Sequence, residues 1–362
     1  MTYIEHSVIK KMAKEGIGLL KHLIATPSIS REEKEAADII EQFIQSNGMD
    51  TWRWGNNVWT MTNVIDRNKP TLLLNAHIDT VKPTSKWSRD PYTPTEEGDR
   101  LYGLGSNDCG GGLVSLIQTF RLLKDEDLAY NLVFLASAEE EISGKNGISS
   151  VLQMLPEIDV AIVGEPTGLQ PAIAEKGLMV VDCKAHGKSG HAAREEGVNA
   201  LYEAIDDINF IRQHKFKKVS QLLGPTKMTV TIANAGTQHN VIPDTCDFTI
   251  DIRTNEYYKN EFVFNFLQKK LKSKIKARSF RLSSSSIPED HPLVKRCLEL
   301  GMKPFGSPTL SDQALMPFPS FKLGPGQSSR SHAADEYICL GEMEHALCCY
   351  LQLLQGTDLR TP

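Results

Sequence analysis

The chain has 362 residues, more than a single hydrophobic core usually serves, so its length favours two domains. Hydrophobic residues make up 40% and charged residues 23%, proportions typical of a globular rather than a disordered protein. A formal net charge of −5 argues against a basic surface for nucleic acid. No apolar run is long enough for a membrane-spanning helix, and the N-terminus lacks the pattern of a signal peptide. We therefore expect a cytoplasmic protein with neither nucleic-acid nor membrane partners.

The seven cysteines form no CxxC pair. An odd number without that spacing indicates neither a disulfide framework nor a thiolate zinc site, and it favours reduced, buried thiols. Cys109 stands apart because it directly follows Asp108, which could bind metal. We nevertheless interpret Cys109 as a packing residue.

The first half of the chain alternates between strand and helix patterns. The apolar runs TLLLNAH, NLVFLASA and DVAIVG predict strands. Amphipathic spacing predicts helices over residues 6–25, 30–48, 112–123 and 147–154, the second of which would begin at a capping box formed by Ser30 and Glu33. Near-continuous Val, Ile and Leu are typical of strands buried on both faces. The pattern therefore predicts an α/β fold with a mainly parallel sheet covered by helices.

The pattern changes after Lys176. Four predicted strands (GLMVVDCKAH, KMTVTIANA, TCDFTIDIR and KIKARSFRL) and two predicted helices (197–213 and 257–272) follow in the order β-α-β-β-α-β, which is that of a ferredoxin-like unit. Phe248, Ile250 and Ile252 alternate with polar residues, as in a sheet with one covered face. We therefore predict an inserted domain over 178–286. Residues 1–177 and 287–362 would form the other domain, which ends in a helix over 339–354.

Residues of the types that bind metal ions lie at or just after the ends of the predicted strands and in two glycine-containing loops. They are His77, Asp108, Glu140, Glu141, Glu165 and His332. Taken singly each is ambiguous, because a histidine after a strand, an aspartate that caps a helix or an acidic helix start is common without a metal. In an open α/β sheet, however, the carboxyl ends of the strands meet along one edge. Together these residues predict a hydrolytic site for divalent ions.

Three consecutive acids, Glu139 to Glu141, follow the run NLVFLASA. Without a cation such neighbours would repel one another. Adjacent residues that leave a strand point in different directions, so one acid can bind metal while its neighbour takes a proton from water. Asp79, two residues after His77, can accept the free ring N–H of that histidine.

Seven motifs together identify a family. They are HIDTVKP, GLGSNDCGGG, AEEEISGKNG, VGEPTG, GHAAREEGVNAL, HNVIPDTCDFTIDIR and GPGQSSRSHAADEY. Over nearly its whole length the chain resembles the dinuclear zinc deacylases and exopeptidases that include acetylornithine deacetylase, succinyl-diaminopimelate desuccinylase, aminoacylase and glutamate carboxypeptidase. It is most similar to the acetylornithine deacetylase branch, because GPG is followed by SHAADEY.

The resemblance implies a catalytic domain with two Zn²⁺ ions per subunit, which Co²⁺ could replace. Glu140 would be the general base and Asp79 the partner of His77, whereas Glu139 stands where relatives usually have Asp. One zinc ion would be held by His77, Asp108 and Glu165, and the other by Asp108, Glu141 and His332.

The resemblance also implies roles for the inserted domain, as a lid and possible dimerisation domain. His191 would stabilise the oxyanion, in related enzymes often from a partner subunit. Asn240 and Arg253 would hold the substrate carboxylate, which a guanidinium can grip through two parallel bonds. From the residues alone, an exposed strand charge remains the alternative for Arg253.

Two departures from the family pattern affect specificity rather than the ligands. Cys109 and Gly110 stand where relatives commonly carry a Met-Lys pair, and Pro83 comes one residue later than usual. These departures put in doubt any substrate preference taken from close relatives.

The resemblance implies hydrolysis of an N-acyl-L-amino acid, with N-acetyl- or N-succinyl-L-ornithine in arginine biosynthesis as the preferred small-molecule substrate. A di- or tripeptidase and a succinyl-diaminopimelate desuccinylase are the enzymatic alternatives. A catalytically silent, metal-dependent amino-acid-binding protein is an alternative of another class, against which the presence of Glu140 argues.

Overall fold

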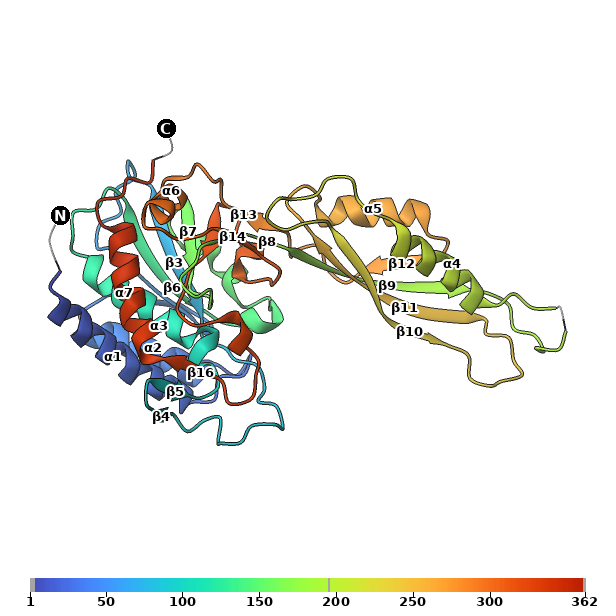
Figure 1. Cartoon of the computed structure of the whole chain (residues 1–362), viewed down its shortest axis with the longest axis horizontal. Coiled ribbons are helices and arrows are strands. Elements are labelled where there is room, and N and C mark those ends of the chain that lie inside the picture. The colour runs from blue at the N-terminus through green and yellow to red at the C-terminus, as the bar shows by residue number, and fades with distance from the viewer. Residues whose placement is uncertain (1–3, 195, 361–362) are drawn as a thin grey trace. The chain divides into compact units, whose positions relative to one another are not determined.

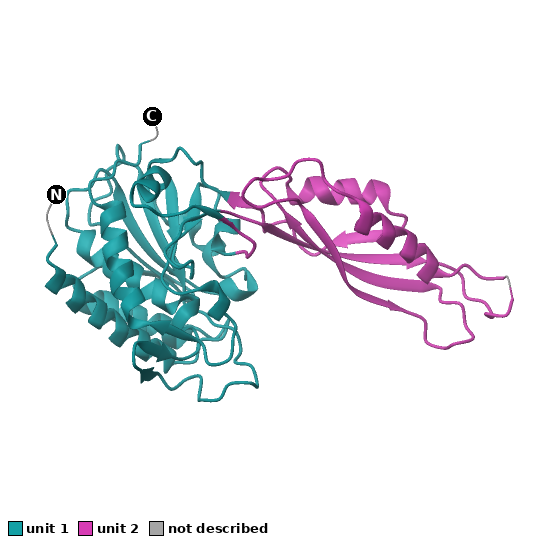
Figure 2. Ribbon diagram, in the orientation of Figure 1, with its two compact units in different colours: residues 1–173, 286–305, 311–362 teal, residues 174–285, 306–310 magenta. Residues whose placement is uncertain are grey.

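The computed structural model describes residues 4–194 and 196–360, which form two compact units (Figure 1, Figure 2). The first unit comprises residues up to 173 together with 286–305 and those from 311 onward. The inserted unit comprises 174–285 and the short segment 306–310, which the sequence did not indicate. Within the described residues, no helix is long and apolar enough to cross a membrane.

The first unit is built on a nine-stranded sheet with the order β1-β2-β6-β3-β7-β15-β8-β13, in which β14 also pairs with β8. The strands are β1 (Trp52–Trp54), β2 (Asn57–Met61), β3 (Thr71–His77), β6 (Asn131–Ser137), β7 (Val160–Val163), β8 (Ala172–Glu175), β13 (Ser285–Ser286), β14 (Phe305–Ser307) and β15 (Ser320–Lys322). The central strands β6, β3, β7 and β15 are parallel, and β2 pairs antiparallel with β6. The predicted α/β class with a mainly parallel sheet is confirmed.

Helices cover one face of this sheet, and turns cover part of the other. The helices of the unit are α1 (His6–Ile24), α2 (Lys34–Ser46), α3 (Gly111–Leu123), α6 (Pro292–Glu299) and α7 (Leu340–Leu354). Helix α3 packs on β3 and β6, and α1 and α7 pack on α3 (Figure 1). On the opposite face, Leu73, Val133 and Leu135 pack with Ile148 and Val151. The helix predicted over 147–154 is wrong, because this segment forms two 3-10 turns instead, Ile148–Ser150 and Leu152–Met154.

The predicted capping box of the second helix is also wrong. Helix α2 begins at Lys34, and neither side chain of the proposed box caps it. The Ser30 hydroxyl donates to Asp79 Oδ2 at 2.6 Å, and the Glu33 carboxylate accepts from the Arg31 N–H at 2.6 Å. Both side chains therefore hold the segment before the helix. A small sheet of β4 (Thr95–Glu97), β5 (Arg100–Tyr102) and β16 (Tyr337–Cys339) was likewise not predicted.

The inserted unit has the predicted ferredoxin-like order. Its elements are β9 (Gly177–His186), α4 (Ala200–Gln213), β10 (Lys227–Ala235), β11 (Thr245–Thr254), α5 (Asn260–Lys270) and β12 (Lys274–Ala277). The strands form an antiparallel sheet with the order β10-β11-β9-β12. Phe248, Ile250 and Ile252 are buried with Ala204 of α4 and Val263 of α5, so this sheet has one face covered by helices.

Candidate metal centre and active site

Three parallel strands of the first unit end at one edge and bring their following residues together. His77, the last residue of β3, pairs with Ser137, the last residue of β6. The Ile78 N–H donates to the Ser137 carbonyl and the Gly164 N–H to the Asn75 carbonyl, both at 2.8 Å, so the pairing continues past the strand ends. The segments with Glu140, Glu141 and Glu165 therefore leave the sheet beside His77.

The structure places the five predicted metal ligands around one point. His77 Nε2 lies 3.3 Å from Asp108 Oδ1 and 3.7 Å from Glu165 Oε1. His332 Nε2 lies 2.9 Å from Glu141 Oε2 and 3.6 Å from Asp108 Oδ2. Asp108 thus presents one carboxylate oxygen to each histidine, which is the arrangement that a bridging ligand needs.

The chemistry of this donor set fits divalent cations. Glu165 Oε1 is buried and has no hydrogen-bond partner among the described residues. Burial and the charge of Asp108 raise the pKa of Glu165 to about 8, and the hydrogen bond to Glu141 raises the pKa of His332 to about 9. Nitrogen and oxygen donors crowded in this way suit zinc or a similar ion, whose positive charge would offset the repulsion among the carboxylates.

The three consecutive acids after β6 have three different partners. Glu139 has a left-handed backbone, with φ 53°, and its carboxylate accepts from Asn146 Nδ2 at 2.8 Å. Glu141 contacts His332, whereas Glu140 Oε2 lies 4.0 Å from His77 Nε2. Burial raises the pKa of Glu140 well above its usual value. Of the three side chains, that of Glu139 is therefore the one tied into the following loop, in which a side chain at Gly144 would overlap its carboxylate.

Asp79 holds the turn that carries these acids as well as facing His77. Its backbone carbonyl lies 2.8 Å from His77 Nδ1, whereas its carboxylate Oδ1 is 3.6 Å from that nitrogen. The carboxylate accepts from the N–H groups of Glu140 and Glu141 at 2.9 and 3.1 Å. An Nδ1–H that donates to the carbonyl of Asp79 leaves Nε2 of His77 free to bind a metal ion.

Asp108 lies in a turn, Ser106–Gly110, that is followed directly by α3. A Cβ atom at Gly112 would overlap the carbonyl oxygen of Gly164, so glycine lets the start of α3 approach the residue before Glu165. The Cys109 thiol donates to the His77 carbonyl at 3.5 Å, and burial raises the pKa of this thiol to about 12. The sulfur also lies near His77 and Glu165, but its hydrogen bond to the His77 carbonyl supports the packing interpretation.

The inserted unit does not bring all of its predicted site residues together. The Ala192 N–H donates to the Asn240 carbonyl at 2.9 Å, so His191 lies close to Asn240. Arg253 lies near the far end of β11, roughly 27 Å from Thr245 at 3.4 Å per residue, whereas Asn240 lies in the loop before Thr245. The Arg253 guanidinium pairs with Asp251 at 2.9 Å. Within one chain Asn240 and Arg253 therefore cannot hold the same carboxylate, and their roles stay predictions.

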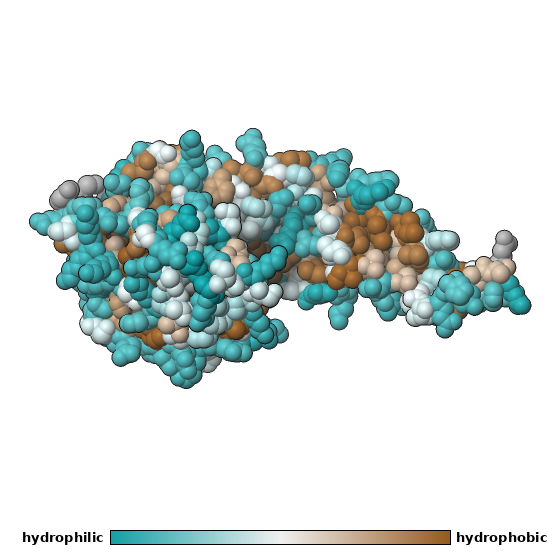
Figure 3. Space-filling view, turned by 60° about the horizontal axis from the view of Figure 1, so that its bottom comes forward, coloured by the Kyte–Doolittle hydropathy of each residue, from teal (hydrophilic) through white to brown (hydrophobic). Residues whose placement is uncertain are grey.

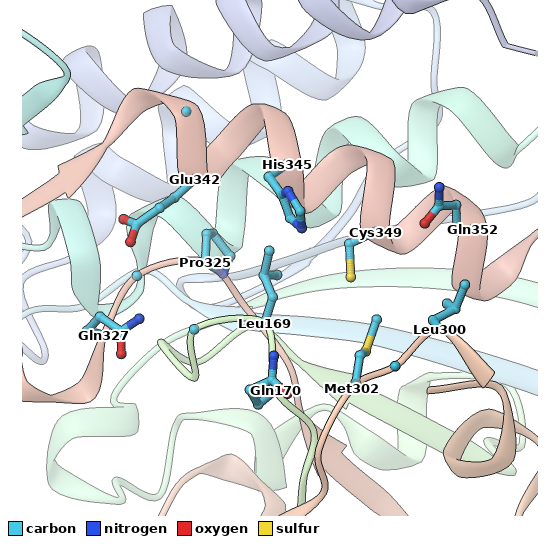
Figure 4. A pocket seen from close by; sticks show the side chains of 14 residues that line it. Leu169, Gln170, Leu300, Met302, Pro325, Gln327, Glu342, His345, Cys349 and Gln352 are labelled. Carbon is cyan, nitrogen blue, oxygen red and sulfur yellow. The ribbon is translucent and has the colours of Figure 1, made fainter. Parts of the chain in front are cut away.

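A cavity of about 540 Å³ in the first unit lies outside this centre, because none of the predicted ligands line it. Figure 4 shows that helix α7 forms one wall, with Glu342, His345 and Cys349, and that loops with Leu169 and Met302 form the other. The cavity is therefore separate from the cluster of predicted metal ligands.

Several buried polar residues beside the centre were missed in the sequence. Asn107, in the turn that holds Asp108, accepts from the Gln327 N–H, and Glu336 accepts from the N–H of Asn107. Ser137 donates to Asp312 at 2.6 Å. The positions of Asn107 next to Asp108 and of Glu336 within SHAADEY could have indicated the first two. We find no such signal for Asp312.

Comparison with known proteins identifies the family. Residues 73–356 match the model of peptidase family M20/M25/M40. The chain belongs to this family. It is 31% identical to the acetylornithine deacetylase of Pectobacterium carotovorum subsp. carotovorum (strain PC1), over 89% of this chain and 92% of that protein. It is 29% identical to the acetylornithine deacetylase of Proteus mirabilis (strain HI4320), over 91% of this chain and 93% of that protein.

Solved structures of the same family share the fold. Aminopeptidase PepT from Bacillus cereus is similar with a TM-score of 0.76 and 16% identity, over 94% of this chain and 98% of that chain. A dinuclear metal-binding M20 peptidase from Bacillus subtilis is similar with a TM-score of 0.73 and 17% identity, over 95% of this chain and 98% of that chain. The predicted family is confirmed, and the protein is a metallo-hydrolase that acts on amide bonds.

Proposed function

We propose that the protein is a dinuclear zinc N-acyl-L-amino-acid deacylase whose substrate is N-acetyl- or N-succinyl-L-ornithine, as in arginine biosynthesis. The observation that carries the metal chemistry is the placement of Asp108 between His77 and His332, with Glu165 and Glu141 beside them. The curated relatives that match most of this chain are named acetylornithine deacetylase, and these names support an acyl-ornithine substrate. Asp108 would bridge two ions, one shared with His77 and Glu165 and the other with Glu141 and His332.

The proposed reaction uses Glu140 to move one proton. When bound, the two ions would polarise the amide carbonyl and acidify a water molecule. The Glu140 carboxylate would take a proton from that water and later deliver it to the leaving amine nitrogen. The Glu140 backbone is held in place by its N–H, which donates to Asp79. Burial raises the pKa of the Glu140 carboxyl, which strengthens its affinity for a proton.

We also propose that the protein forms a homodimer through the inserted unit. Strand β10 is an edge strand of its sheet, and an edge strand can pair with a strand of another chain. Ile232 of β10 is 52% exposed and Tyr202 of α4 is 67% exposed, and apolar residues gather on this unit in Figure 3. In such a dimer Asn240 and Arg253 could reach one substrate carboxylate from different chains, and His191 would serve the partner's site.

The experiment is a substrate panel assayed together with metal content. Purified protein loaded with Zn²⁺ is given N-acetyl-L-ornithine, N-succinyl-L-ornithine, N-succinyl-diaminopimelate, dipeptides and tripeptides, and amine release is measured. We expect two zinc ions per chain and a kcat/KM for an acyl-ornithine that exceeds those for the peptides. Addition of a chelator should abolish turnover, and Zn²⁺ or Co²⁺ should restore it.

Each alternative gives a different result in this panel. Higher kcat/KM for peptides would make the protein a di- or tripeptidase, and higher kcat/KM for succinyl-diaminopimelate would make it the corresponding desuccinylase. Two bound zinc ions without turnover of any compound, but with saturable binding of an amino acid, would favour the silent binding protein. Failure to bind metal would contradict the proposal as a whole.

A further inference from the structure

Two buried side chains join the turn that holds Asp108 to the loop that holds His332. Glu336 is 2% exposed and Asn107 is fully buried. Each belongs to one of the two segments and hydrogen-bonds to the other, although 229 residues separate Asn107 from Glu336 in the sequence. We refer to this pair, Asn107 and Glu336, as the clamp.

The Glu336 carboxylate receives three backbone N–H groups of the turn. Its Oε1 accepts from Asn107 at 2.8 Å and from Asp108 at 2.9 Å, and its Oε2 accepts from Gly105 at 3.2 Å. The Glu336 backbone carbonyl also accepts from the N–H of Gly103 at 3.0 Å. The position of the Asp108 backbone is therefore set directly by a side chain from the loop of His332.

The Asn107 side chain makes the reciprocal contacts. Its Oδ1 accepts from the Gln327 N–H at 2.9 Å, and its Nδ2 donates to the Gln327 carbonyl at 3.1 Å. The same Nδ2 donates to the Ser331 hydroxyl at 3.3 Å, one residue before His332. Both ends of the loop segment from 327 to 331 are thus held against the turn.

The bridging position makes this attachment important for metal binding. Asp108 presents Oδ1 to His77 and Oδ2 to His332, so a relative shift of the two segments changes the donor geometry of both ions. Metal–ligand distances tolerate deviations of only about 0.2 Å. We propose that Asn107 and Glu336 are positioning residues that set the distance between Asp108 and His332 and thereby the affinity for the metal pair. This inference rests on the metal roles proposed above, but it does not depend on the substrate.

A general contribution to stability is the competing explanation, and the chain offers matched controls for it. Asn131 is also a buried asparagine that joins two segments, since its Nδ2 donates to the carbonyls of Asp66 and Lys69 at 2.9 and 3.1 Å. It begins β6, at the opposite end of the strand from the metal centre. Asp207 of the inserted unit is a buried carboxylate that accepts from the N–H groups of Lys272 and Ser273 at 3.0 and 2.8 Å.

The test compares Glu336→Gln and Asn107→Ala with the controls Asp207→Asn and Asn131→Ala in the full-length protein. Glutamine at 336 keeps the size of the side chain but cannot accept from all three N–H groups without turning its own N–H₂ toward one of them. The measurements are Zn²⁺ affinity by competition with a chromophoric chelator, the visible spectrum of the Co²⁺-loaded protein, and the Tm of the metal-free protein.

We expect both clamp variants to bind at least one Zn²⁺ ion roughly 10- to 100-fold more weakly and to show a changed Co²⁺ spectrum. The two controls should lower Tm while leaving Zn²⁺ affinity and the Co²⁺ spectrum unchanged. Unchanged affinity and spectrum in both clamp variants would overturn the inference, whatever happens to Tm. If Glu336→Gln does not fold, Asn107→Ala decides alone. If the unsubstituted protein binds no Zn²⁺, the proposed metal roles fail instead of the clamp.

Discussion

The two sheets of this protein differ in where they carry charged side chains. Every residue of β3 and β6 in the first unit is buried, because helices and turns cover the two faces of that sheet. Strand β11 of the inserted unit alternates between buried and partly exposed residues. A sheet covered on both faces can place reactive groups only where its strands end, whereas a sheet covered on one face carries polar groups along its length. The metal centre and the Asp251–Arg253 pair illustrate these two arrangements.

The largest effect should come from the edge of the covered sheet. We expect Glu140→Gln to lower kcat by about 10²- to 10⁴-fold, because the amide cannot take a proton from water. Zinc content, measured by elemental analysis, should stay near that of the unsubstituted protein. Glu139→Gln is the matched comparison, since this neighbouring acid is tied to Asn146. An equal loss of kcat in both variants, with metal retained, would show that Glu140 is not the base.

Substitutions in the two hydrophobic cores should show that the two sheets contribute unequally to metal binding. Phe134 of β6 and Phe248 of β11 are both buried. We expect Phe134→Ala and Phe248→Ala each to lower the free energy of unfolding of its own unit by about 3–5 kcal/mol. Only Phe134→Ala should also weaken Zn²⁺ binding, because β6 leads directly into Glu140 and Glu141. Equal losses of Zn²⁺ affinity would mean that the centre depends on both cores.

The smallest effect on stability should come from the exposed edge of the inserted sheet. We expect Ile232→Lys to change the free energy of unfolding by no more than about 0.5 kcal/mol, because the side chain is 52% exposed. It should nevertheless shift a dimer toward monomer in sedimentation velocity. Val219→Lys is the control, since Val219 is 56% exposed in the same unit but lies outside β10 and α4. A monomer before substitution, or dissociation by both variants, would contradict the proposed interface.

Elements with strong periodicity could be predicted from the sequence. The runs TLLLNAH and NLVFLASA form β3 and β6, and the alternation of Phe248, Ile250 and Ile252 describes β11. The positions of His77 and Glu165 at strand ends were sufficient to expect them at one edge. In each case the deciding interaction is the burial of apolar residues, which leaves a local pattern in the chain.

Polar contacts between distant segments could not be predicted in this way. Ser30 and Glu33 have the spacing of a capping box, yet Ser30 contacts Asp79 and the Glu33 carboxylate accepts from the Glu139 N–H at 3.2 Å. The Glu336 carboxylate accepts hydrogen bonds from a turn more than two hundred residues earlier in the sequence. A polar side chain has several possible partners, and the one it takes is decided by the folded backbone rather than by its neighbours in the sequence.

The contact between Glu139 and the loop at Gly144 has a consequence for protein engineering. No Cβ atom fits at Gly144 while the Glu139 carboxylate occupies its present place. A library randomised at position 144 alone should therefore return glycine from any selection for folded protein. Because the Cβ atom of Glu139 would itself lie 2.5 Å from an added Cβ, larger residues become acceptable there only when position 139 is glycine in the same clone. The two codons therefore have to be varied as a pair.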